Sequence, residues 1–185
     1  MQHGEALRLH QGLGGVVHAL FAAFGGGGLE LSPATQGPPD DAVLGMVTTP
    51  KEFVPAAAAS GARLEIHAVQ DLEGLEDARQ VAIAGDGSGP LLALYEPEVA
   101  AIPGVRIYVG RVEGRPVTTA TGWTANAATG IFQVATPPAH RRRGYGGAVT
   151  SRAVLDGFAA GADLAWLQPS PSGERLYRKL GFRQV

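Results

Sequence analysis

One stretch constrains the fold of this chain more than any other: "VATPPAHRRRGYGGAVTSRAVL", from Val134 to Leu155. An apolar strand runs through two prolines into three arginines, and a glycine-rich turn then opens a helix. Gly144, Gly146 and Gly147 have no Cβ, so their backbone N–H groups can approach an anion closely. At a helix start these groups lack intrahelical partners, and the helix dipole favours negative charge. The stretch therefore predicts a strand, a phosphate-holding turn and a helix.

The arginines of this stretch strengthen the prediction. Arg141, Arg142 and Arg143 carry positive charge on forked donors that match phosphate oxygens. The segment alone also fits an ordinary glycine-rich turn beside a solvated basic patch, and this alternative stays open. A net charge of −2 over 185 residues argues against bulk binding of nucleic acid or an anionic membrane. The arginine run therefore indicates a local site for a small polyanion.

The composition limits which folds, chemistries and compartments are expected for this chain. With 45% hydrophobic residues the chain has enough apolar side chains for the core of one domain. The absence of cysteine excludes disulfides, a thiolate metal site and a cysteine nucleophile. His3, His10, His18 and His67 show no ligand spacing, so no metal is expected. The apolar stretches are too short or broken to span a bilayer, and no secretion signal is visible, so cytoplasm is the expected compartment.

From about Arg63 the chain alternates between strand and helix patterns, which indicates an α+β fold around a central sheet. The segment "RLEIHAVQ" has the period of a strand, and Asp71 fits the N-cap of a helix to about Ala84. Glu113 and Gly114 predict a hairpin turn between two strands. The other expected elements are a strand near Val43 to Val47, a strand from Gly130 to Thr136, a helix to about Ala160, a strand from Asp163 to Leu167 and a final strand in "FRQV".

The last helix shows signals at both of its ends. Ser170 fits its N-cap, with Pro171 at the first helical position. Gly181 fits the left-handed residue that ends it, and Phe182 is then expected to fold back onto Tyr177. The sequence therefore predicts that Tyr177 is held near a helix end.

The first sixty residues are less regular. Apolar residues from Leu9 to Phe24 form a helical stripe that contains several glycines. We expect residues 1–61 to form an N-terminal extension, and residues 62–185 to form the main domain. The stripe also makes self-association into a homodimer an option.

Two motifs that follow each other along the chain, "HRRRGYGGAV" and "LYRKLGF", resemble those of the GNAT superfamily of acyl-CoA-dependent N-acyltransferases. The family's phosphate motif is R/Q-x-x-G-x-G/A, which Arg141 to Gly146 satisfies, and Leu176 to Phe182 is similar to the family's last helix. The resemblance covers roughly residues 63–185. It implies a central, largely antiparallel sheet with splayed strands flanked by helices, and acetyl-CoA as the co-substrate.

The resemblance also implies roles for particular residues. The strand before the turn would bulge and splay, and its backbone at Val134, Ala135 and Thr136 would pair with the pantetheine arm. Tyr177 would hydrogen-bond the thioester sulfur and protonate the departing thiolate. Ser170 stands where many members carry an asparagine that contacts the pantetheine. The coenzyme's pyrophosphate would lie on the turn, formed by Arg141, Arg142, Arg143, Gly144, Tyr145, Gly146 and Gly147.

The function implied is transfer of the acetyl group from acetyl-CoA to a primary amine by direct attack, with the oxyanion held by a strand N–H. The acceptor is a small molecule or a peptide, and the sequence does not say which. Candidates for the general base are Glu96, Glu98, Tyr108 and Glu113, and a water chain serves equally well. The alternative is a catalytically inactive module that binds acetyl-CoA for regulation or interaction.

Overall fold

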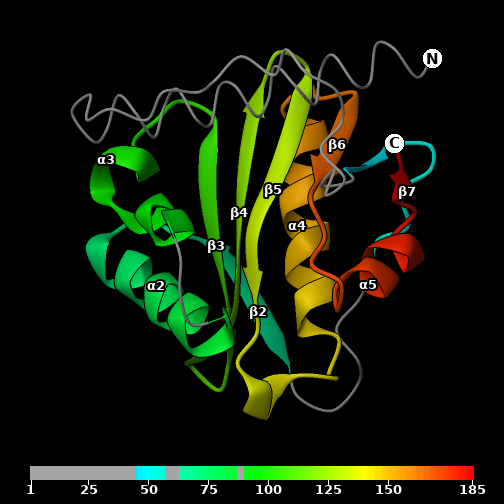
Figure 1. Cartoon of the computed structure of the whole chain (residues 1–185). Helices are drawn as coiled ribbons and strands as arrows, with labels where there is room; N and C mark the ends of the chain where they lie inside the picture. The colour runs from blue at the N-terminus through cyan, green and yellow to red at the C-terminus, as the bar shows by residue number, and fades with distance from the viewer. Residues whose placement is uncertain (1–44, 57–62, 87–89) are drawn as a thin grey trace.

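A computed structural model of the protein describes residues 45–56, 63–86 and 90–185. These residues form a central sheet with helices on both sides (Figure 1). The helix expected from Leu9 to Phe24 lies outside the described residues. The elements in chain order are β1 Met46–Thr48, β2 Leu64–Ala68, α2 Leu72–Asp86, η1 Pro90–Tyr95, α3 Pro97–Ala100, β3 Val105–Val112, β4 Arg115–Ala125, β5 Ala128–Ala135, η2 Pro138–His140, α4 Tyr145–Ala159, β6 Leu164–Leu167, α5 Glu174–Lys179 and β7 Arg183–Gln184.

The sheet has seven strands within the described residues, in the order β2-β3-β4-β5-β6-β1-β7. Among these described strands, only the pair β5 and β6 is parallel, and the other neighbours are antiparallel. The crossover between the parallel strands contains α4, as a parallel connection requires. The expected α+β fold with a largely antiparallel sheet is therefore confirmed.

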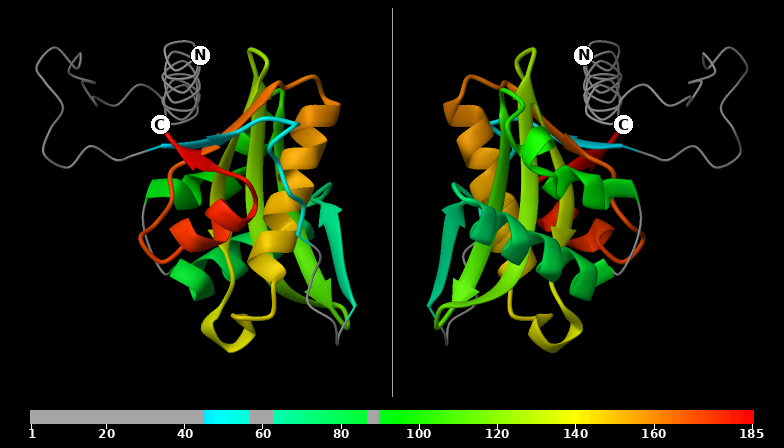
Figure 2. Two further views of the ribbon diagram at one scale, coloured as in Figure 1. Left: turned by 90° about the vertical axis from the view of Figure 1, so that its right-hand side faces the viewer. Right: turned by 90° about the vertical axis from the view of Figure 1, so that its left-hand side faces the viewer.

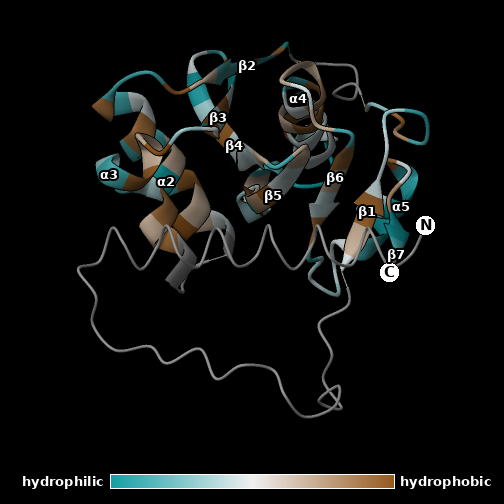
Figure 3. Ribbon diagram, turned by 90° about the horizontal axis from the view of Figure 1, so that it is seen from above, coloured by the Kyte–Doolittle hydropathy of each residue, from teal (hydrophilic) through white to brown (hydrophobic). Residues whose placement is uncertain are grey.

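The helices divide between the two faces of the sheet, which Figure 3 shows from above. On β3, Ile107 and Val109 pack with residues of α2 and η1 in one buried cluster. Tyr108, between them, packs with Val149 and Ala153 of α4 in another. This alternation follows the two-residue period of a strand whose two faces are both covered. None of the helices in the described ranges is long and apolar enough to cross a membrane.

Local signals explain where several elements begin and turn. The Asp71 carboxylate accepts a 2.7 Å hydrogen bond from the Gly74 N–H, so it caps α2 as expected. β3 and β4 are joined through Glu113 and Gly114, whose φ angles of 51° and 76° are both in the left-handed region. Positive φ at both central residues gives the hairpin turn that matches strand twist. The predicted cap and the predicted hairpin are both confirmed.

The N-terminal strand β1 lies inside the sheet, between β6 and β7. Val47 is opposite Trp166 of β6 on one side and opposite Arg183 of β7 on the other. In Figure 2 the cyan β1 and the red β7 run beside each other, although they come from opposite ends of the chain. A strand was expected here, but as part of an extension. Instead it supplies a strand of the domain's own sheet.

The start of α5 differs from the expectation, whereas its end agrees. The N-cap is Gly173 rather than Ser170, and it makes no side-chain cap bond. The Ser170 carbonyl accepts hydrogen bonds from the Gly173 and Glu174 N–H groups, so Ser170 begins a turn that precedes the helix. Gly181 has a φ of 83°, and the Phe182 N–H donates to the Tyr177 carbonyl, which is the expected left-handed termination.

Candidate functional site

β5 contains a bulge and separates from β6, as the family resemblance implies. β5 and β6 pair over only three positions, the last being Gly130 with Trp166. Beyond this point the register with β4 slips, because Thr121 is opposite Phe132 but Thr119 is opposite Ala135. The extra residues of β5 include Gln133, whose φ of 45° is unusual for a residue with a side chain. Val134, Ala135 and Thr136 therefore follow a bulge on a strand that has left its parallel neighbour.

The glycine-rich turn leads directly into the N-terminus of α4. Gly144 is the N-cap of α4 with a φ of 80°, and Arg142 has a φ of 63°. The first bond of the helix runs from the Ala148 N–H to the Gly144 carbonyl. The N–H groups from Tyr145 to Gly147 therefore have no acceptor within the helix, and they lie at the positive end of its dipole.

Three predicted parts of the site meet at Gly146. A Cβ on this glycine would lie 3.6 Å from the Thr136 hydroxyl, 4.0 Å from a Val134 methyl and 3.7 Å from a Leu176 methyl. Those neighbours belong to the end of β5 and to α5. The segments that the resemblance assigns to pantetheine, pyrophosphate and the leaving sulfur are thus adjacent in space.

The three arginines have different surroundings. The Arg141 guanidinium donates to the backbone carbonyls of Thr136 and Gly85. Arg142 and Arg143 are exposed, and neither makes a hydrogen bond or ion pair with another described residue. Two cations are therefore free for a ligand, whereas the third is already occupied by the protein.

Tyr177 is buried on α5, with 8% of its surface exposed. Its ring packs edge-on against Phe182, 6.0 Å between centroids, as expected. Burial raises the pKa of Tyr177 to about 12, so the phenol keeps its proton at neutral pH. Its hydroxyl makes no hydrogen bond with any described residue, which leaves the O–H free to donate to a ligand.

Ser170 is exposed, and its hydroxyl lies 3.2 Å from that of Ser172. A Cβ on Gly173 would lie 3.2 Å from the Ser170 hydroxyl and 3.1 Å from the Tyr177 ring. Ser170 and Tyr177 therefore border the same glycine. A contact of Ser170 with the pantetheine stays a prediction.

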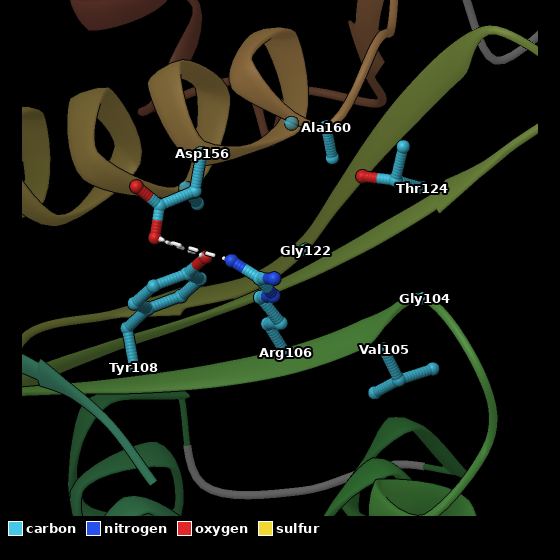
Figure 4. Close-up of a pocket in the computed structure, with 10 residues that line it drawn as sticks. Gly104, Val105, Arg106, Tyr108, Gly122, Thr124, Asp156 and Ala160 are labelled. Carbon is cyan, nitrogen blue, oxygen red and sulfur yellow. Dashed lines mark hydrogen bonds and ion pairs between the residues drawn. The ribbon is translucent and has the colours of Figure 1, made fainter.

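The candidate bases are not gathered at this site. The Tyr108 hydroxyl donates to Asp156 at 3.0 Å, in a cavity of about 200 Å³ between β3, β4 and α4 that Arg106 also lines (Figure 4). Burial and the Asp156 charge both raise the pKa of Tyr108, so the phenol keeps its proton at neutral pH and is not available as a base. Glu113 is exposed in its hairpin turn, and Glu96 and Glu98 are exposed at the start of α3.

A buried group of hydroxyls near the bulge carries no signal in the sequence. The Tyr95 and Thr121 hydroxyls are buried and have no hydrogen-bond partner in the described part of the chain. Burial raises the pKa of Tyr95 to about 12, while the neighbouring Thr119 and Thr121 hydroxyls lower it. Thr119 and Thr121 are the β4 residues that flank the register slip with β5. Tyr95 comes from a distant segment, so only the tertiary structure brings these groups together.

Residues 103–184 match the family model of the acetyltransferase (GNAT) domain. The matched part of the chain includes β3, β4, β5, β6 and β7, the glycine-rich turn and α5. No functionally curated protein matches the sequence. Among the described residues, no three His, Asp or Glu side chains are placed to hold a metal ion.

Solved structures share the fold. A GCN5-related N-acetyltransferase from Kribbella flavida is 26% identical with a TM-score of 0.60, covering 76% of this chain and 53% of that protein. The ribosomal-protein-S18-alanine N-acetyltransferase of Escherichia coli is 16% identical with a TM-score of 0.58, covering 66% and 79%. An aminoglycoside N-acetyltransferase in complex with CoA is 15% identical with a TM-score of 0.55, covering 68% and 91%. This chain thus spans about half the length of the Kribbella protein, and the last two similarities concern the fold alone.

Proposed function

We propose that this protein is an N-acetyltransferase that moves the acetyl group of acetyl-CoA to a primary amine by direct attack. The observation that carries the proposal is the meeting of the β5 end, the glycine turn and α5 at Gly146. The N–H groups at the start of α4 and the free Arg142 and Arg143 side chains suit a pyrophosphate. The CoA complex of an aminoglycoside N-acetyltransferase with the same fold supports the choice of coenzyme.

The backbone of β5 suits the thioester arm. After Gly130 its side toward β6 has no strand partner, so N–H and C=O groups are available to an extended ligand. Pro137 and Pro138 follow, and neither has an N–H to continue the pairing. A pantetheine chain laid along β5 would lead from the bulge to the turn, and a β5 N–H near the bulge would hold the oxyanion.

The reaction consists of one bond formed and one broken. The amine nitrogen attacks the thioester carbonyl carbon, the C–N bond forms, the C–S bond breaks, and one nitrogen proton passes to water, which leaves the amide and the CoA thiolate as products. Tyr177 donates its O–H to the sulfur as negative charge develops there. The Tyr177 phenol, with a pKa of about 12, is a weaker acid than a thiol of pKa about 8.5. Full transfer of the Tyr177 proton to the sulfur therefore costs about 5 kcal/mol, unless the proton released by the nitrogen reprotonates the phenolate. Tyr177 therefore acts first as a hydrogen-bond donor.

Coenzyme binding is tested by calorimetric titration of the full chain with acetyl-CoA. Gly146→Asp places a negative charge at the turn, and its Cβ would lie at ordinary contact distances from its neighbours. We expect it to abolish measurable binding, while Gly146→Ala, which adds the same Cβ without charge, binds nearly as the native chain does. Equal binding by both variants would place the coenzyme elsewhere.

Catalysis is tested by release of free CoA thiol in a screen of amino acids, polyamines, aminoglycosides and peptides with a free N-terminus. With any acceptor found, Tyr177→Phe should lower kcat by about 10²-fold and leave the Kd for acetyl-CoA unchanged. Full activity in this variant would remove Tyr177 from the mechanism. Tight acetyl-CoA binding without turnover of any acceptor would favour the inactive binding module.

A further inference from the structure

Arg141 connects two segments that are distant in sequence. Its Nε donates to the Thr136 carbonyl at 3.0 Å, and its Nη2 donates to the Gly85 carbonyl. Thr136 directly follows β5, and Gly85 lies in the last turn of α2. The fork of one guanidinium thus bridges the end of α2, the end of β5 and the start of the glycine turn.

The end of α2 is a suitable place for this cation. The last carbonyls of a helix lack partners and carry the negative end of its dipole. The last turn of α2 contains no basic residue of its own. Arg141 supplies the missing positive charge from another segment, and its donors reach a carbonyl that the helix leaves free.

The contact between α2 and β5 is also close. A Cβ on Gly85 would lie 3.0 Å from the Ala135 Cβ and 3.1 Å from the Thr136 nitrogen, so only a glycine fits there without displacement. Ala135 and Thr136 are two of the residues that the resemblance assigns to the pantetheine arm. The end of α2 therefore packs directly against the expected coenzyme strand.

We propose that Arg141 is a positioning residue, which fastens the glycine turn and the end of β5 to α2, and that Arg142 and Arg143 are the arginines that face the coenzyme's phosphates. Arg142 and Arg143 have no partner among the described residues, whereas the Nε and Nη2 atoms of Arg141 both donate to backbone carbonyls. The phosphate part of this inference rests on the proposed function, but the fastening of α2 does not.

Substitution by lysine separates the two roles, because lysine keeps the charge and loses the planar fork. A lysine binds phosphate well as a point charge, but one ammonium cannot reproduce the Nε and Nη2 geometry. In the full chain, Arg141→Lys should raise the Kd for acetyl-CoA about tenfold. The matched variants Arg142→Lys and Arg143→Lys should change it less than about threefold. Near-native affinity of Arg141→Lys would assign Arg141 to the phosphates and overturn the inference.

Hydrogen exchange without any ligand gives a second readout. In Arg141→Lys the backbone amides at the end of α2, residues 83–86, should exchange about tenfold faster, since the last turn loses its capping donor. Arg143→Lys should leave them unchanged. Unchanged exchange in Arg141→Lys would overturn the inference even if acetyl-CoA binding fell. Faster exchange in a chain that does not bind acetyl-CoA would keep the fastening role and reject the proposed function.

Discussion

Backbone conformation at single residues marks the site more clearly than side-chain type does. Five residues other than glycine have a positive φ in the described parts of the chain. Glu113, Asn126 and Ala127 lie in hairpin turns, where such angles are common. The other two are Gln133, in the β5 bulge, and Arg142, in the glycine turn. Within the described residues, a positive φ at a non-glycine residue outside hairpins thus occurs only in the β5 bulge and the glycine turn, as is typical of functional segments.

Two left-handed glycines provide a matched comparison. Gly181 has a φ of 83°, and a Cβ there would lie 2.0 Å from the Glu52 carbonyl oxygen. Gly161 has a φ of 96°, and a Cβ there would meet nothing within 4 Å. We expect Gly161→Ala to lower the free energy of unfolding by about 1 kcal/mol, and Gly181→Ala by about 3 kcal/mol or more. Urea denaturation measures both, and equal losses would mean that the Glu52 segment moves away freely.

The burial of Tyr177 predicts a dependence of stability on alkaline pH. Its pKa is about 12 in the folded protein and about 10 in an unfolded chain. The unfolded chain therefore releases this proton first, so stability that is fully present below pH 10 is lost as pH rises through 12. Between pH 8 and 11, native stability should fall about 1 kcal/mol further than that of Tyr177→Phe. Urea denaturation at several pH values measures both proteins, and a stability difference between them that does not change with pH would contradict the prediction.

At the scale of elements, α4 is held against the sheet by polar contacts at its middle as well as by its apolar face. Asp156 accepts hydrogen bonds from Tyr108 of β3 and from Arg152, one turn earlier on the helix. Arg152 also donates to the Ile66 carbonyl of β2. The edge strand β2, the neighbouring β3 and the helix that begins at the glycine turn are therefore joined through one carboxylate.

Removal of that carboxylate should be costly. Asp156→Ala leaves the buried Tyr108 hydroxyl without an acceptor, and we expect a loss of about 2 kcal/mol in the free energy of unfolding. The control Glu174→Ala breaks an exposed pair with Arg178 on α5 and should cost less than about 1 kcal/mol. The double variant Asp156→Ala, Tyr108→Phe should lose less free energy of unfolding than the sum of the losses in the two single variants. Simple additivity would show that the two groups do not interact.

At the scale of the whole molecule, the sheet includes an inner strand from the N-terminal part of the chain. β1 pairs with β6 and with β7, and its residues Met46, Val47 and Thr48 are all buried. Without β1, the short β7 would have no neighbour, and β6 would have an unpaired edge. The sheet therefore includes residues that precede the boundary expected at residue 62.

This arrangement predicts the outcome of a truncation. A protein that begins at residue 63 should lose cooperative unfolding or aggregate, because the inner strand between β6 and β7 is missing. A peptide of residues 45–56, added in excess, should restore part of the lost stability, whereas the same peptide with Val47→Pro should not, since proline cannot donate within a ladder. Cooperative unfolding of the truncated protein alone would contradict this view of β1.

The sequence predicted features that depend on neighbouring residues. The Asp71 cap, the hairpin at Glu113 and Gly114 and the left-handed Gly181 each follow from a few adjacent side chains, and each is confirmed. The Ser170 cap was wrong, because the turn from Pro171 delays the helix to Glu174. The bulge was expected only from the family resemblance, because Gln133 has no intrinsic preference for a positive φ.

By itself, the sequence determined the order of most strands and helices and the glycine turn, because the period of apolar residues, caps and turn glycines act over a few residues. The tertiary structure alone decided that β1 lies between β6 and β7, that Arg141 is bound to two carbonyls, and that Tyr108 faces Asp156. These features depend on pairing and packing between segments tens of residues apart. Such contacts depend on the free energy of the whole fold, and a pattern of neighbouring residues does not predict them.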